Sequence, residues 1–284
     1  MKNLIAFQGA VGANSNLACN KFYPNFEAKA FPTFFDVFKA VECGEVALGM
    51  IPLENSSAGR VSEIHSLLQE NSVAIVAEYF VSIEHYLAAL EDATLADIKK
   101  VYSHPQALMQ CKNNLRNLGV EACDFPNTAE AAKFVAGQGD KSKAAICSKV
   151  AAELNGLKIV QENLQDSKGN STVFIVIAKE AINPDPKISP VIISLMFTIK
   201  NYPGSLYKAL GSFATNGVSM MQIESFIRGG VHAPGGVSEQ AAFFVMIEGH
   251  PEQANVELAL KELEFFAKDV KVLGVYYADK SRFS

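Results

Sequence analysis

Uncharged polar side chains lie at the ends of three apolar segments whose continuous apolar runs predict buried strands. They are Asn55 and Ser56 in the first, Ser103 in the second, and Asn170, Ser171 and Thr172 in the third. Glu54 adds one carboxylate beside Asn55, and Gln110 lies two turns into the helix that follows Ser103. A buried polar group left unpaired costs about 1–3 kcal/mol, so these groups are either hydrated or paired with a bound molecule. Because open α/β sheets bind ligands where their strands end, the pattern predicts one binding site for a small polar ligand.

These segments also have structural interpretations. Asn55 or Ser56 would cap a following helix, which would leave Glu54 in solvent. His104, which precedes Pro105 at the start of a helix, suits a packed or capping histidine better than a general base. We find no Ser-His-Asp or Cys-His arrangement, no P-loop and no metal-ligand spacing. The sequence therefore favours binding by neutral hydrogen bonds and oriented dipoles over covalent or metal chemistry.

The segment "AFQGAVGANSNLA" near the start indicates a strand, a tight turn and the start of a helix. Ser15 is placed to cap that helix, and the exposed N–H groups of the turn would attract an anion. Gly9 and Gly12 give a GxxG spacing, which is not the GxGxxG of dinucleotide-binding proteins. A simple capped turn explains this segment without any ligand.

Composition places the chain among globular proteins with about two domains, since it has 284 residues, 49% hydrophobic and 19% charged. The net charge of -5 argues against a general nucleic-acid surface. No apolar run approaches the roughly 20 residues of a membrane helix, and the start lacks the long apolar region of a signal peptide. The 5 cysteines form no CxxC and the 5 histidines no HExxH. We therefore expect a cytoplasmic protein with reduced thiols and without a metal.

Prolines at positions 184, 186 and 190 predict a linker over residues 183–190, because proline interrupts both helices and strand ladders. Upstream, strand and helix patterns alternate, which indicates a largely parallel α/β domain. Residues 72–90 suggest a crossover between two lobes of that domain. Downstream, the segments 191–199, 205–217, 218–227, 241–249, 251–270 and 270–277 alternate as β-α-β-β-α-β. This is the ferredoxin-like order.

Taken together, the polar segments resemble those of the prephenate dehydratase family. "IPLENSSAGRV" resembles its Pro-[Ile/Leu]-Glu-Asn-Ser segment, "SHPQALMQC" its Ser-His-Pro-Gln…Gln-Cys segment, and "NSTVF" its Thr-Arg-Phe signature. "PGSLYKALGSFATNGVSMMQIES" is similar to the ACT regulatory module that often follows. The likeness covers nearly the whole chain, and four motifs in this order are specific.

The resemblance implies a fold and an activity. The fold is a catalytic domain over residues 1–182, built like a periplasmic binding protein from lobe 1 (1–78 and 163–182) and lobe 2 (79–162). An ACT domain over residues 191–284 follows. The activity is conversion of prephenate to phenylpyruvate in L-phenylalanine biosynthesis, without a cofactor. Because aromatisation drives the reaction, positioning and oriented dipoles suffice.

The resemblance also implies site residues. Thr172 would donate a hydrogen bond to the departing hydroxyl, while Asn55, Ser103 and Gln110 would orient the substrate. Glu54 would be the proton source if desolvation raised its pKa. The residues expected to bind substrate are Ser15, Ser56, Asn170, Ser171 and Phe174. Val173 replaces the family's arginine and Ala13 its usual threonine, so we predict a working but weaker enzyme.

For the ACT module, the resemblance implies that L-phenylalanine binds between subunits of a homodimer or homotetramer and inhibits the enzyme. The residues expected to bind it are Gly204, Ser205, Leu206, Glu224 and Ser225. Phe226 and Ile227 replace the second half of the family's Glu-Ser-Arg-Pro motif, which leaves the strength of feedback open. A purely structural dimerisation module is the alternative.

Other functions stay open at this point. An enzyme of the same family that prefers arogenate is the near alternative, and a non-catalytic amino-acid-sensing protein is the alternative from another class. A solute-binding protein for transport is disfavoured by the lack of an export signal.

Overall fold

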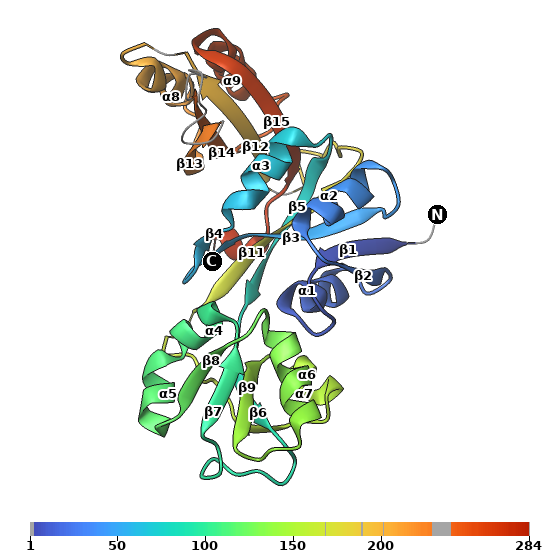
Figure 1. Ribbon diagram of the computed structural model, residues 1–284. Coiled ribbons are helices and arrows are strands. Elements are labelled where there is room, and N and C mark those ends of the chain that lie inside the picture. Colours follow the sequence, from blue (N-terminus) through green and yellow to red (C-terminus); the bar gives the residue numbers. More distant parts are fainter. Residues whose placement is uncertain (1–2, 168, 189, 201, 229–239, 284) are drawn as a thin grey trace, which may run out of the picture. The chain divides into compact units, whose positions relative to one another are not determined.

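The computed structural model describes residues 3–167, 169–188, 190–200, 202–228 and 240–283 (Figure 1). The chain divides into two compact units, Met1–Val61 with Tyr79–Phe174, and Ser62–Glu78 with Ile175–Ser284. The predicted linker 183–190 has no helix or strand in its described part, and its residue 189 lies outside the described residues. The domain bounds expected from the sequence remain predictions.

The first sheet has six strands in the order β2-β1-β3-β11-β5, with β4 paired to β3. These strands are β1 (Leu4–Gln8), β2 (Glu27–Phe31), β3 (Leu48–Asn55), β4 (Gly59–Arg60), β5 (Ala74–Ser82) and β11 (Ser171–Ala178). β1 pairs in parallel with both β2 and β3. The helices α1 (Asn14–Phe22) and α2 (Phe34–Glu42) connect these three strands, which is the βαβ arrangement that the alternating pattern predicts.

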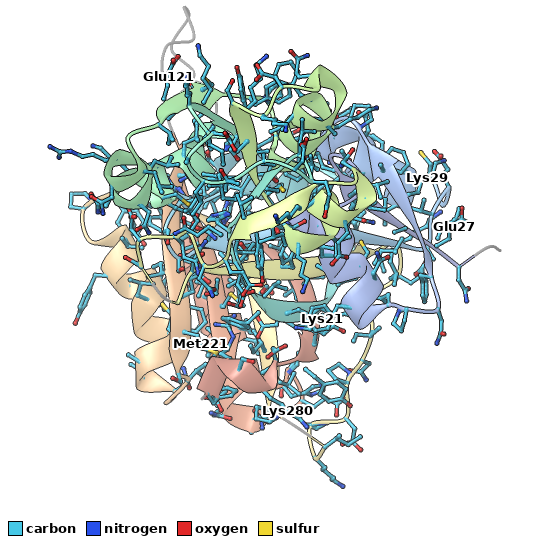
Figure 2. The ribbon with its side chains drawn as sticks, turned by 90° about the horizontal axis from the view of Figure 1, so that it is seen from below. Lys21, Glu27, Lys29, Glu121, Met221 and Lys280 are labelled. Atoms are coloured by element: carbon cyan, nitrogen blue, oxygen red, sulfur yellow. The ribbon has the colours of Figure 1, made fainter. Side chains whose placement is uncertain are left out.

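Local signals in the sequence start and protect these elements. A capping box starts α2, because Thr33 Oγ1 accepts from Asp36 N at 3.1 Å and Asp36 Oδ2 accepts from Thr33 N at 3.2 Å. Glu27 and Lys29 lie on the edge strand β2 (Figure 2). Lys29 Nζ forms an ion pair with Glu45 Oε1 at 2.6 Å. Charged side chains on an edge strand discourage pairing with another chain.

The second sheet has five strands in the order β10-β6-β9-β7-β8. They are β6 (Tyr86–Ala89), β7 (Lys100–Ser103), β8 (Glu121–Asp124), β9 (Lys143–Cys147) and β10 (Lys158–Gln161). The short helices α4 (Pro105–Gln110) and α5 (Lys112–Leu118) cover one face of this sheet, and α6 (Thr128–Gln138) and α7 (Lys149–Leu154) cover the other (Figure 1). Two separate apolar clusters fill the two faces.

The chain passes between the two sheets twice, from β5 into β6 and from β10 into β11. Two α/β lobes joined in this way are the architecture of periplasmic binding proteins, so the fold class inferred from the sequence is confirmed. Residues of the two connections, among them His85, Gln165 and Asn170, contribute to the site described below.

The third sheet has four strands in the order β13-β14-β12-β15. Its elements are β12 (Val191–Ile199), α8 (Ser205–Thr215), β13 (Met220–Arg228), β14 (Gln240–Glu248), α9 (Ala254–Phe266), β15 (Ala267–Tyr277) and the 3-10 helix η1 (Lys280–Phe283). This order confirms the ferredoxin-like arrangement. The predicted last helix extended to residue 270, which is wrong, because the chain becomes extended at Ala267.

The helix α3 (Ser62–Glu70) belongs to the same compact unit as the third sheet. Lys271 Nζ on β15 donates to three carbonyls at the end of α3, those of Leu68, Gln69 and Asn71, at 2.8, 3.0 and 2.9 Å. A cation at a helix C-terminus satisfies carbonyls that lack a partner within the helix and complements the helix dipole. His65 of α3 packs edge-on against Phe244 of β14, with ring centroids 4.9 Å apart. These contacts fix α3 on the sheet face that carries Phe244.

In the described part of the chain, no helix is long and apolar enough to cross a membrane. Within the same residues, no group of three or more His, Cys, Asp or Glu side chains is arranged to hold a metal ion.

Candidate functional site

Five side chains from distant parts of the sequence form one hydrogen-bonded group, which we call the amide cluster. They are Asn55 at the end of β3, His85 before β6, Gln110 at the end of α4, Asn170 before β11, and Thr172 within β11. Asn170, Thr172 and His85 are buried, with 6%, 8% and 5% of their surface exposed, whereas Asn55 and Gln110 are partly exposed. The proximity of Asn55, Gln110, Asn170 and Thr172 agrees with the arrangement that the sequence predicts.

Asn55 is the centre of the amide cluster, and two backbone groups determine which way its carboxamide points. Its Oδ1 accepts from the N–H groups of Ser57 and Ala58 at 3.0 and 2.9 Å. Because a backbone N–H can only donate, Oδ1 must face this turn and Nδ2 must face the other way. Nδ2 then donates to Asn170 Oδ1 at 2.8 Å and to Thr172 Oγ1 at 2.9 Å.

The orientation of Asn55 determines what the hydroxyl of Thr172 can do. Since Nδ2 of Asn55 has no lone pair to offer, Thr172 Oγ1 must accept in this hydrogen bond. The hydroxyl proton of Thr172 is therefore directed elsewhere, as a donor. This direction is compatible with the donor role that the sequence resemblance implies for Thr172, and that role stays a prediction.

The orientation of Asn55 also determines the hydrogen-bond directions of the other two carboxamides, those of Asn170 and Gln110. Asn170 uses its Oδ1 for Asn55, so its Nδ2 donates to Gln110 Oε1, at 3.0 Å. Gln110 Oε1 also lies 2.6 Å from His85 Nε2. Gln110 Nε2 donates back to Asn55 Oδ1 at 3.4 Å, which closes a ring of three carboxamides. A ring with one consistent direction fixes each amide more firmly than an isolated pair does.

Caps and backbone contacts position α4, which carries Gln110. His104 Nδ1 accepts from Gln106 N at 3.2 Å and Pro105 is the first helical residue, so His104 is a capping histidine, as one interpretation of the sequence held. At the other end, Gln110 O accepts from Asp166 N at 2.8 Å. The carboxylate of Asp166 in turn accepts from Asn113 N and Asn114 N in the first turn of α5, at 2.9 and 3.0 Å.

Ser56 and Ser171 join the ends of β3 and β11. Ser56 N donates to Ser171 O at 2.9 Å, and Ser171 N donates to Ser56 Oγ at 3.0 Å. Asn55 Nδ2 adds a contact of 3.1 Å to the same Ser171 carbonyl. These two serines hold Asn55 against Thr172, which gives them a structural function beside the expected substrate contact. Asn55 and Ser56 cap no helix, because α3 begins only at Ser62.

The electrostatics of the site exclude a thiol nucleophile near Gln110. Cys111 is fully buried, and burial raises its pKa to about 12. Burial lowers the pKa of His85, and the hydrogen bond to Gln110 opposes part of that shift. At neutral pH the cluster is therefore a set of uncharged donors and acceptors, with a neutral imidazole at one end.

A cavity of about 610 Å³ borders the amide cluster at Asn170. Its lining is formed by Ser82, Ile83, Glu84, Asn163, Gln165, Asp166, Gly169 and Asn170. Asn163 has a φ of 53°, a conformation that non-glycine residues rarely adopt. Such backbone strain persists only where the surroundings enforce it.

The structure does not bring four of the expected site residues into the cluster. Ser103 is fully buried, and its hydroxyl donates to Ile146 O at 2.7 Å, which joins β7 to β9. Phe174 is 1% exposed and belongs to the core around β11.

Ser15 and Glu54 also lie outside the cluster. Ser15 does not cap α1, because Ala13 occupies the N-cap position and Asn16 Oδ1 accepts from Gly12 N at 3.0 Å instead. Glu54 pairs in register with Arg60, and strand alternation places its side chain on the face of β3 opposite Asn55.

The residues expected to bind phenylalanine are also divided. Gly204 is the N-cap of α8 with a φ of 79°, and the buried Ser205 starts the helix. Leu206 packs against the core of the third sheet. Glu224 and Ser225 are neighbours on β13, so their side chains point to opposite faces of the sheet. Glu224 lies on the α3 side, with Oε2 3.4 Å from His65 Nε2. The expected pair therefore does not face one ligand from the same side.

His85 is the member of the cluster that sequence reasoning missed. The segment "SIEHYLAAL" gives one histidine between two strands, without a partner at a fixed spacing. Its partner Gln110 lies 25 residues away, and Gln165, which accepts from His85 N at 3.0 Å, lies 80 residues away. Only a position at the crossover between two lobes, the site of ligand binding in such folds, could have drawn attention to it.

The geometry can be compared with known proteins. A sequence profile described as prephenate dehydratase matches residues 5–182. This chain belongs to the prephenate dehydratase family. It is 39% identical to a bifunctional N-acyl-homoserine lactone acylase/prephenate dehydratase of Komagataeibacter europaeus over 99% of this chain and 98% of that protein. It is 36% identical to arogenate dehydratase/prephenate dehydratase 2 of Arabidopsis thaliana over 97% of this chain and 73% of that protein.

Solved structures agree on the fold. GqqA, described as a novel type of quorum quenching acylase, has a TM-score of 0.88 at 40% identity, covering 98% of this chain and 99% of its own. Prephenate dehydratase of Arthrobacter aurescens in complex with L-Phe has a TM-score of 0.86, covering 96% of this chain and 90% of its own. At 24% identity, the second likeness shows the fold alone.

We predict that Asn55→Asp destabilises the protein by about 2–4 kcal/mol, because a carboxylate oxygen would then face the oxygens of Asn170 and Ser171. Urea unfolding at neutral pH measures the loss. Asn127→Asp is the matched control, since Asn127 Oδ1 caps α6 by accepting from Glu130 N at 2.7 Å and an aspartate caps equally well. Equal stability of the two variants would contradict the assigned orientation of Asn55.

Proposed function

We propose that this protein converts prephenate to phenylpyruvate in the cytoplasm, as a step toward L-phenylalanine. The observation that carries the proposal is the hydroxyl of Thr172, which Asn55 Nδ2 holds as an acceptor at 2.9 Å so that its proton is free to be donated. The ring C–O bond of prephenate breaks as the bond to the ring carboxylate breaks and carbon dioxide leaves. The departing hydroxide takes one proton and leaves as water, and the electron pair of the lost carboxylate completes the aromatic ring.

The character of the site suits this reaction. Expulsion of hydroxide needs a donor at the oxygen that accumulates negative charge, and oriented neutral donors in a buried site perform this well. No covalent intermediate is required, in keeping with the buried thiol of Cys111. Thr172 supplies the hydrogen bond, while the proton that converts hydroxide to water reaches it by relay, since a threonine hydroxyl is too weak an acid to be its source.

Arogenate is the alternative substrate to prephenate. Arogenate differs from prephenate in its side chain, and the same elimination would give phenylalanine. The Arabidopsis relative at 36% identity is named for both substrates. The relative at 39% identity is named for an N-acyl-homoserine lactone acylase activity as well. We place prephenate first because both of these names include it.

The purified chain incubated separately with prephenate, arogenate and an N-acyl-homoserine lactone tests the proposal. We expect phenylpyruvate from prephenate at the highest kcat/KM. Faster release of phenylalanine from arogenate would reassign the substrate within the family. Release of a fatty acid from the lactone alone would make the chain an acylase, and no turnover of any of the three would favour an amino-acid-sensing protein.

We predict that Thr172→Val lowers kcat for prephenate by about 10²–10³-fold, because it removes a donor to the leaving oxygen while keeping the side-chain shape. Thr172→Ser retains the hydroxyl and should stay within about tenfold of the wild-type rate. Steady-state formation of phenylpyruvate measures both variants, and circular dichroism confirms their folding. Full activity in Thr172→Val would remove Thr172 from the mechanism.

We further propose that the ferredoxin-like part is an ACT module that binds L-phenylalanine near Gly204 and Ser205 and lowers the dehydratase activity. Support comes from the strand order, from the left-handed N-cap at Gly204, whose φ is 79°, and from the L-Phe named in the Arthrobacter aurescens complex. The subunits would pair as a homodimer or homotetramer.

We predict that L-phenylalanine binds with saturable heat and raises the melting temperature, since a ligand at 100 times its Kd stabilises the folded state by about 2.7 kcal/mol. Titration calorimetry and thermal unfolding with L-phenylalanine measure these effects, and D-phenylalanine is the control. If millimolar L-phenylalanine produces neither heat nor a thermal shift, the module is structural only.

A further inference from the structure

His85 is a buried imidazole that the mechanism above leaves without a role. It is 5% exposed, and its Nε2 lies 2.6 Å from Gln110 Oε1. Its backbone is held on both sides by the second connection between the sheets: His85 N donates to Gln165 Oε1 at 3.0 Å, and His85 O accepts from Leu164 N at 2.8 Å. The backbone of His85 is therefore held by contacts that do not involve the ring nitrogens.

The direction of the hydrogen bonds determines which nitrogen of His85 carries the proton. The backbone N–H groups of Ser57 and Ala58 orient Asn55, Asn55 Nδ2 orients Asn170, and Asn170 Nδ2 donates to Gln110 Oε1. Gln110 therefore presents its oxygen to His85. An oxygen at 2.6 Å requires a donor opposite it, so the neutral ring must carry its proton on Nε2.

The hydrogen bond between His85 and Gln110 Oε1 determines where the amide nitrogen of Gln110 lies. With Oε1 occupied by His85 and Asn170, Gln110 Nε2 gives one proton to Asn55 Oδ1 at 3.4 Å and keeps a second. Prephenate carries two carboxylates, which accept hydrogen bonds and repel a carbonyl oxygen. A flipped Gln110 amide would present its oxygen at that position instead.

We propose that His85 is a positioning residue for the dehydration: its Nε2–H joins Asn170 Nδ2 as a second donor to Gln110 Oε1 and so holds the Gln110 carboxamide with an N–H facing the anionic substrate. This inference rests on the proposed function for its substrate, and on the geometry alone for the proton on Nε2. Burial lowers the pKa of His85, which favours the neutral ring. His85 itself needs no contact with substrate.

Two variants of His85 test the role. The amide nitrogen of a glutamine overlays Nε2 of histidine, whereas that of an asparagine overlays Nδ1, so His85→Gln keeps the donor and His85→Asn loses it with a similar polarity. We expect kcat/KM for prephenate to fall about tenfold in His85→Asn, as for the loss of one oriented hydrogen bond, and to stay within about threefold in His85→Gln. Wild-type kcat/KM in a folded His85→Asn, or equal losses in both variants, would overturn the proposal.

A second measurement does not depend on turnover. Long-range proton–nitrogen NMR of the ¹⁵N-histidine-labelled chain shows which ring nitrogen is protonated, and the signal that disappears in His85→Gln identifies His85 among the 5 histidines. We expect a neutral ring with the proton on Nε2 at pH 7. A proton on Nδ1 alone would refute the proposed contact with Gln110. Failure of the wild-type chain to turn over prephenate or arogenate would instead refute the proposed function, so the two failures are distinguishable.

Discussion

The orientation of one carboxamide organises the whole site. Two backbone N–H groups, those of Ser57 and Ala58, can only donate, and they meet Asn55 Oδ1 at 3.0 and 2.9 Å. From that constraint follow the direction of the Asn55 bond to Thr172 and the order of donors and acceptors through Asn170 and Gln110. A side-chain amide can flip, but a peptide N–H in a tight turn cannot change from donor to acceptor. A fixed backbone thus determines the chemistry of mobile side chains.

Preorganisation of this kind is what an elimination without cofactor or nucleophile requires. The residues that meet in the cluster are separated by as many as 117 positions in the sequence, as for Asn55 and Thr172. Bringing these side chains together costs conformational entropy. The pairing of β3 with β11 and the caps that Asp166 provides to α5 offset this cost during folding, before substrate binds. Donors that are already aligned need no reorganisation as charge develops on the leaving oxygen.

Part of the site and the order of the elements could be predicted from the sequence, because strand ends and helix caps have local signatures. Apolar runs that end in polar residues identified Asn55 and Thr172, and the ferredoxin-like order followed from segment lengths and periodicity. Contacts between distant residues have no such signature, so the His85–Gln110 bond could not be predicted. Phe174 is 1% exposed, and the family motif alone gives no indication of that burial. Glu224 and Ser225 match the first half of the family's Glu-Ser-Arg-Pro motif, but as neighbours in a strand their side chains point to opposite faces of the sheet.

The most direct test of the central claim is a neutron crystal structure of the deuterated protein. Deuterium atoms on Asn55 Nδ2 should point toward Thr172 Oγ1, with Oδ1 facing the turn, and the deuterium of the Thr172 hydroxyl should point away from Asn55. An Asn55 oxygen that faces Thr172, with the hydroxyl deuterium directed at it, would contradict the account.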